Sequence, residues 1–177
     1  QVQLHHLGIT AGEAALFQQL AGHVIYAGRA LRPSSEAILR GAAAQSGLWS
    51  QGISGDLPIV LLRISDAEHL ESARELLQAH EYWRLKGLAV DLVILNERQS
   101  SYIQDFNIAL ETLVRTMRMR PHPAEDQQVQ GRVFVLRADL MPVVTRAILS
   151  SAARVVLVAQ RGNLLDQLER LTEPVIA

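Results

Sequence analysis

The sequence predicts an α/β fold: a small doubly wound, mostly parallel four-stranded sheet preceded by an N-terminal helical arm. From residue 58 onward, short and uniformly apolar runs alternate with amphipathic stretches in the order βαβαβαβα. Strands that are apolar on both faces are typical of a parallel sheet covered by helices on both sides. Before residue 58 the periodicity is helical only. We therefore predict a helical linker arm and glycine-rich loop over residues 1–57, and an α/β domain over residues 58–177.

Composition narrows the class of protein. The 177 residues are 49% hydrophobic and 20% charged, with a formal net charge of −1, as in ordinary globular proteins. This balance gives no indication of nucleic-acid binding. The absence of cysteine excludes disulfides, thiolate metal sites and a cysteine nucleophile. No apolar run reaches the roughly 18–20 residues that span a bilayer, so we expect a soluble chain with no direct membrane insertion. The sequence opens abruptly, without methionine, and we therefore expect it to be a piece of a longer chain.

The arm begins with a capping box. Thr10 and Glu13 have the spacing in which each side chain caps the other residue's backbone N–H, and helical periodicity behind them predicts a helix over residues 11–26. Ser34 is the expected N-cap of a second helix, through about residue 41. Two short helices do not enclose a core, so we expect the arm to pack on another part of the protein.

The α/β domain divides into four strand–helix pairs. Residues 153–159 are read as a strand rather than a helix tail, because they are β-branched and apolar on every side. Ser65 and Glu68 have capping-box spacing at the start of the first helix, and Asp139 with Pro142 is expected to begin the third. The predicted strands are residues 59–64, 89–95, 131–136 and 153–159. The first, third and fourth helices end near residues 87, 151 and 171, and the apolar stripe of the second runs to Met117.

The glycine-rich loop QSGLWSQGISGDLP, residues 45–58, joins the two parts. Phosphate-binding glycine loops follow a strand and begin a helix, whereas this loop precedes a strand, which argues against a nucleotide site here. Trp49, Ser54 and Asp56 in the loop are instead candidates for contact with a glycan or a neighbouring domain. Trp83 is a further candidate: its ring suits sugar stacking, although covering the domain's edge or meeting another domain is the preferred interpretation.

A second candidate site lies where the strands end. Asp66, Glu97 and Asp139 follow three of the predicted strands, and an open α/β sheet binds ligands at the carboxyl ends of its strands. Capping of the following helices is the preferred role for Asp66 and Asp139. The six histidines show no metal-binding spacing, and no motif predicts a cofactor or a complete catalytic constellation.

Several segments, in order, resemble the bacterial cyclic β-1,2-glucan synthases, in the C-terminal half that is similar to cellobiose and chitobiose phosphorylases. The most specific is the run from Gln45 to Ile64, QSGLW followed by GISGDLPIVLLRI. The others are LAGHVIY at residue 20, AHEYWRLKGLAVDLVILNE at residue 79, VFVLRAD at residue 133, AARVVL at residue 152 and RGNL at residue 161. Together these segments cover most of residues 15–170.

The resemblance implies a large protein of the bacterial inner membrane, in which a glycosyltransferase part uses UDP-glucose and a phosphorylase-like part adjusts chain length. This chain would be a linker and inserted α/β domain on the cytoplasmic face, between a β-supersandwich and a helical barrel. The family's catalytic carboxylate belongs to that barrel, so no catalytic residue is transferred. We expect a non-catalytic accessory domain that packs against neighbouring domains and handles β-1,2-glucan. The alternative is a small α/β enzyme, or a module that binds a sugar phosphate or nucleotide sugar at the sheet edge.

Overall fold

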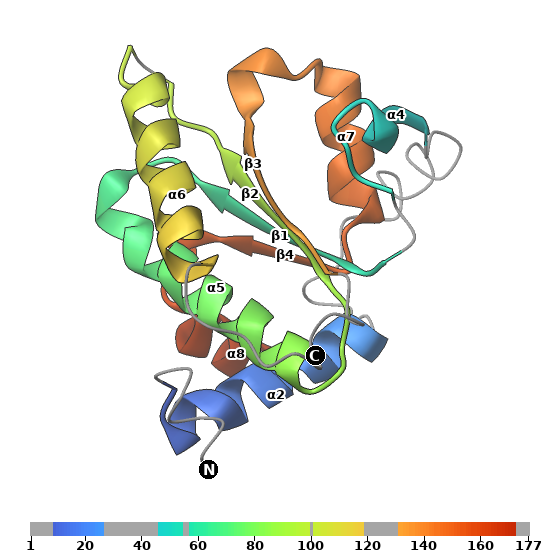
Figure 1. The fold of residues 1–177 in the computed structure, drawn as a ribbon, viewed down its shortest axis with the longest axis vertical. Helices are drawn as coiled ribbons and strands as arrows, with labels where there is room; N and C mark the ends of the chain where they lie inside the picture. The colour runs from blue at the N-terminus through green and yellow to red at the C-terminus, as the bar shows by residue number, and fades with distance from the viewer. Residues whose placement is uncertain (1–8, 27–45, 55–56, 100, 119–130, 173–177) are drawn as a thin grey trace, which may run out of the picture.

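The computed structural model describes residues 9–26, 46–54, 57–99, 101–118 and 131–172 (Figure 1). Its centre is a sheet of four strands in the order β3-β2-β1-β4, and every described pair of strands is parallel. The predicted α/β fold is therefore confirmed, and so is the strand assignment for the run near residue 155. The strands are β1 (Ile59–Ile64), β2 (Asp91–Asn96), β3 (Val133–Arg137) and β4 (Val155–Val158).

Helices connect successive strands. The connecting helices are α5 (Leu70–Leu85), α6 (Ile103–Arg118) and α7 (Val143–Ala152), and α8 (Leu164–Thr172) follows β4. Three 3₁₀ turns, η2 (Ala67–His69), η4 (Ala138–Leu140) and η5 (Ala159–Arg161), follow β1, β3 and β4. Ahead of the sheet lie α2 (Ala11–Tyr26) and one short helix in the glycine-rich loop, α4 (Ser46–Trp49), which the sequence did not predict.

Two apolar cores, one on each face of the sheet, show that the fold is doubly wound. Helices α2, α5, α6 and α8 cover one face of the sheet, and α7 and α4 cover the other (Figure 1). Side chains of the first group form one core, and those of the second group form the other together with Ile53. The chain steps from β1 to β2 to β3 in one direction and then returns past β1 to β4. Because crossovers between parallel strands are right-handed, this reversal places α7 on the face opposite α5 and α6.

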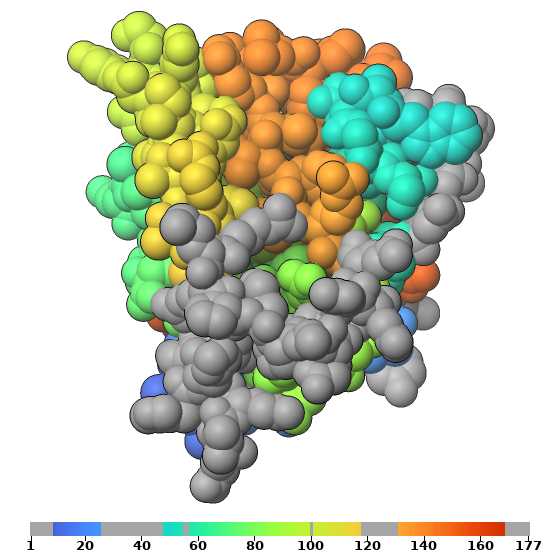
Figure 2. All heavy atoms as spheres, in the orientation of Figure 1, coloured from blue at the N-terminus to red at the C-terminus, as the bar shows by residue number. Residues whose placement is uncertain are grey.

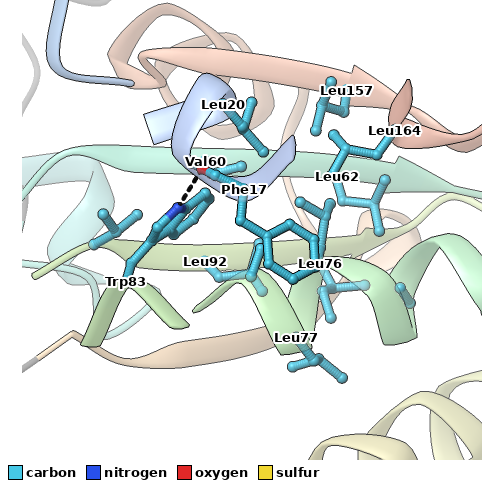
Figure 3. Close-up of a cluster of buried hydrophobic side chains, with 14 of the residues drawn as sticks. Phe17, Leu20, Val60, Leu62, Leu76, Leu77, Trp83, Leu92, Leu157 and Leu164 are labelled. Atoms are coloured by element: carbon cyan, nitrogen blue, oxygen red, sulfur yellow. Dashed lines mark hydrogen bonds between the residues drawn. The ribbon is translucent and has the colours of Figure 1, made fainter. Parts of the chain in front are cut away.

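Helix α2 is a full member of the larger core. Phe17, Leu20 and Val24 are completely buried, and α2 contacts both α5 and α8. The indole N–H of Trp83 in α5 donates a hydrogen bond of 2.9 Å to the carbonyl oxygen of Phe17 (Figure 3). Gln18 adds a hydrogen bond from its Nε2 to the hydroxyl of Tyr82, at 2.6 Å. We expected the arm to pack on another part of the protein. Its first helix, α2, packs on the α/β domain of the same chain.

The predicted helix starts are partly confirmed. Thr10 and Glu13 form the capping box, with each backbone N–H donating to the other side chain at 3.1 Å. The capping box predicted at Ser65 is wrong: Asp66 is the cap, accepting from the N–H of Glu68 at 3.1 Å, and α5 begins only at Leu70. Ser65 instead accepts a hydrogen bond from the side-chain amide of Gln160, 95 residues away, which is information that local spacing does not contain.

The second arm helix, predicted near residues 34–41, and the candidate residue Asp56 lie outside the described residues.

Candidate functional site

A depression of about 970 Å³ lies over the carboxyl ends of the strands. The connections after β1 and β2 lead to helices on one face of the sheet, whereas the connection after β3 leads to α7 on the other face. The depression lies between these two sets of connections. Asp66, Glu97 and Asp139 all line this depression. The structure thus brings together the three acidic residues that the sequence placed at the sheet edge, because the carboxyl ends of parallel strands share one side of the sheet.

Each of these acids already binds a group of the protein. Both carboxylate oxygens of Glu97 accept from Nε of Arg63 at 3.1 Å. Asp139 binds Arg137 through two hydrogen bonds, of 3.0 and 2.7 Å. The Arg137 guanidinium holds the pKa of Asp139 below its usual range, so this carboxylate stays ionised. Asp66 caps η2, so all three acids bind other groups of the protein. Their main role is therefore to hold the loops around the depression in place.

Predicted capping roles divide between the two aspartates. Asp66 is the N-cap of η2, as expected. The expectation that Asp139 begins the third helix is wrong, because Asp139 lies inside η4 and Pro142 is the N-cap of α7. The side chain of Asp139 turns back to Arg137 instead.

Arginines form the other part of the lining. Arg146 projects from the first turn of α7, and its Nε is buried without a hydrogen-bond partner in the described part of the chain. The guanidinium of Arg98 lies over the rings of Tyr102 and Phe106, with 5.9 and 6.0 Å from its central carbon to the ring centroids. The sequence assigned neither arginine to the site, because the candidates chosen at the sheet edge were the three acids alone. The usable signal is that the first turn of a helix after a parallel strand lies above the same sheet edge.

Neutral polar groups complete the site. Gln160, after β4, donates to Ser65, after β1, and so bridges the two loops, while Gln99 is exposed at the rim. Within the described ranges, no group of three or more histidine, cysteine or acidic side chains is arranged to hold a metal ion. The depression therefore offers hydrogen-bond donors, acceptors and guanidinium groups, a set suited to recognising a polar ligand.

The loop candidates have separate positions. Trp49 is 63% exposed, and its indole N–H donates to the carbonyl oxygen of Ser54 at 3.1 Å, so these two residues do lie together. Trp83, in contrast, is 1% exposed. The sugar-stacking role considered for Trp83 is therefore wrong, because its ring does not lie at the surface. Its indole contacts α2 instead, and the preferred interpretation, that Trp83 covers the domain's edge or meets another domain, stays a prediction. The return of α2 onto α5 buries its ring.

An exposed apolar surface lies beside the depression. Leu140 at the end of η4 is 69% exposed, and Val143 and Val144 at the start of α7 are 72% and 69% exposed. We call these three residues the α7 patch. Helix α4, which carries Trp49, packs beside α7, and the two regions adjoin on the surface seen in Figure 2. Large aliphatic side chains in consecutive exposed positions are uncommon on an isolated surface and often mark an interaction site.

Among the described residues, no helix is both long and apolar enough to cross a membrane. No model of a known protein family matches the chain. A search of curated proteins finds a cyclic β-(1,2)-glucan synthase, NdvB, of Rhizobium meliloti (strain 1021), which is 44% identical over 172 residues. The match covers 97% of this chain and about 6% of the length of the relative. The match supports membership of the cyclic β-(1,2)-glucan synthase family, with the chain as the counterpart of one short segment of a much longer protein.

Proposed function

We propose that the chain is a non-catalytic accessory segment of a cyclic β-1,2-glucan synthase, working on the cytoplasmic face of the bacterial inner membrane. It would support packing between neighbouring domains of the same polypeptide, namely a β-supersandwich and a helical barrel, and assist in handling β-1,2-glucan. The observation that carries this proposal is 44% identity over 97% of the chain to a protein named as such a synthase.

The α7 patch supports the packing role. Its three aliphatic side chains are each about 70% exposed, although burying such a side chain fully is worth about 1.5–3 kcal/mol. About 94% of the relative lies outside the match, since the match covers 6% of it, so the same polypeptide offers ample surface to cover the patch. We therefore assign the patch to another domain of the synthase.

A chimera tests the accessory role. This chain would replace the matching segment of the Rhizobium meliloti synthase, and the cyclic β-1,2-glucan made by membranes carrying the chimera would be measured. We expect synthesis to persist with the chain in place and to fall at least about tenfold with a flexible Gly/Ser linker of equal length. Equal synthesis by the linker version would show that the segment is dispensable, and the accessory role would be abandoned.

Two substitutions in the same chimera separate docking from folding. Val143→Asp and Val144→Asp place charges on the α7 patch and should lower synthesis, because a charge would be buried at the interface. Ile108→Asp is the matched control, since Ile108 is 54% exposed but lies on α6, on the opposite face of the sheet. Equal effects from all three substitutions would argue against a docking role for the patch.

The depression at the sheet edge favours a second candidate function, namely binding of a sugar phosphate or nucleotide sugar. It gathers Asp66, Glu97 and Asp139 with guanidinium groups in a volume large enough for such a ligand. Calorimetric titration of the 177-residue chain with β-1,2-gluco-oligosaccharides, glucose 1-phosphate and UDP-glucose compares the two roles. Saturable binding of a phosphorylated sugar supports the second candidate, binding of oligosaccharide alone supports glucan handling, and no binding leaves the packing role.

A further inference from the structure

We infer that the depression at the sheet edge is an anion site, in which Arg146 binds the phosphoryl group of a small organic phosphate. This inference rests on the second candidate function above and names the chemical group that the site recognises. Some of the charged side chains that line the depression are already paired with other groups of the protein, whereas Arg146 is not.

The acids are the bound groups. Glu97 gives both oxygens to Arg63, and Asp139 receives two hydrogen bonds from Arg137. Asp66 uses one carboxylate oxygen to cap η2. A ligand cation would have to compete with guanidinium groups for two of the three carboxylates. The carboxylates therefore do not form a cation site, and their pairing also neutralises Arg63.

Arg146 is the group directed at the open volume. No ion pair of the described residues involves its guanidinium, and its Nε is a buried donor without a partner. Buried donors in proteins nearly always have a partner, so this unbound donor marks Arg146 as a group that the described residues leave unsatisfied. An anion that enters the depression can accept from both terminal nitrogens of this guanidinium at once, in the paired geometry that guanidinium offers to phosphate.

The surroundings favour an organic phosphate over a bare anion. At about 970 Å³ the depression far exceeds one phosphate group. The amides of Gln99 and Gln160 and the hydroxyl of Ser65 also line it, and hydroxyl-rich ligands are recognised by such groups. The phosphoryl end would lie at Arg146 on α7, with the hydroxylated part extending across the strand ends towards Ser65 and Gln160.

The test is a set of titrations followed by ¹H–¹⁵N NMR, using the 177-residue chain with glucose 1-phosphate, inorganic phosphate and glucose as probes. We expect saturable shifts with glucose 1-phosphate, weaker shifts with inorganic phosphate and none with glucose. Arg146→Gln should weaken glucose 1-phosphate binding at least about tenfold, and Arg146→Lys less, because lysine keeps the charge but not the paired donors.

Arg154→Gln is the matched control, because Arg154 is exposed at the opposite end of β4 and its removal should leave binding unchanged. Spectra with native dispersion show that each variant is folded. Unchanged binding by folded Arg146→Gln, or equal loss in the Arg154 variant, would overturn the role of Arg146. Binding of β-1,2-gluco-oligosaccharides in the calorimetric titration described above, without any phosphate binding here, would refute the anion site while keeping a ligand site. Silence with every probe in both experiments would refute both.

Discussion

At the scale of single residues, Gly131 is fixed by the backbone of the neighbouring strand. A Cβ added there would lie 2.4 Å from the carbonyl oxygen and 2.8 Å from the nitrogen of Val90, and neither backbone atom can move aside without disturbing β2. We expect Gly131→Ala to lower the free energy of unfolding by about 1–3 kcal/mol, as overpacking does in other cores. Urea denaturation measures this change.

Gly22 provides the control for that substitution. It lies within α2, and a Cβ built there meets no atom within 4 Å. Gly22→Ala should therefore raise the free energy of unfolding by about 0.5–1 kcal/mol, because alanine is the better helix former. If Gly131→Ala were as stable as the Gly22 variant, the close approach of Gly131 to Val90 would be refuted.

Asp91 makes stability depend on pH. Burial raises its pKa above the usual value, while the backbone N–H of Arg132, which donates to Oδ1 at 3.0 Å, and the charge of Arg132 lower it in part. Because the folded state holds the proton more tightly, Asp91 contributes stability below the ordinary aspartate pKa, and this contribution is lost as pH rises through the raised value. Asp91→Asn keeps an oxygen that can accept from the N–H of Arg132, but its side chain does not titrate.

The free energy of unfolding of Asp91→Asn, relative to the parent, should therefore increase with pH from about 4 upward and then level off. Urea denaturation at a series of pH values gives both curves. A difference that stays constant with pH would show that Asp91 titrates alike in the folded and unfolded chain.

At the scale of elements, α2 is the helix whose assignment has the largest consequence. The division of the chain at residue 57 stays a prediction, and Phe17 tests it, because its fully buried ring lies in the core shared with α5. If α2 and the sheet unfold together, Phe17→Ala should lower the free energy of the single unfolding transition by about 3–5 kcal/mol. Gln19→Ala, at an exposed position of the same helix, should have little effect. A separate early transition that carries the whole loss would support an independent arm.

The elements could be predicted where their signal is local. Apolar β-branched runs located β1 and β4, and the caps at Thr10 and Asp66 depend on residues within a few positions. The burial of Trp83 was not predicted because it depends on α2, in which the contacting Phe17 lies 66 residues earlier in the chain. The helical turn at α4 was missed because it has only four residues, one of them Gly47, and so carries no periodicity.

At the scale of the whole molecule, the two faces of the sheet are covered unequally by the described residues. Helices α2, α5, α6 and α8 pack on one face, while α7, α4 and the loop after it pack on the other. All five residues of β3 are only partly buried. The exposed α7 patch lies on the lightly covered face, which is therefore the side that we propose for contact with the remaining synthase.

The candidate site was predictable in part for the same global reason. Parallel strands must present their carboxyl ends on one side, so the meeting of Asp66, Glu97 and Asp139 followed from the strand assignment alone. The pairing of those acids with arginines could not be predicted from the strand assignment. Arg63 on β1 binds Glu97, which follows the neighbouring strand β2 and lies 34 residues later in the chain. Nor could the position of Arg146 be predicted, because it depends on the face that α7 occupies.

The opposite surroundings of the two tryptophans give the chain two built-in optical reporters. Trp49 and Trp83 are its only tryptophans, at 63% and 1% exposure. Trp83 should emit at short wavelength and resist iodide quenching, whereas Trp49 should emit at long wavelength and be quenched readily. A domain that covers the region around α4 and α7 would protect Trp49 without altering the emission of Trp83. One fluorescence spectrum would thus follow docking and unfolding separately.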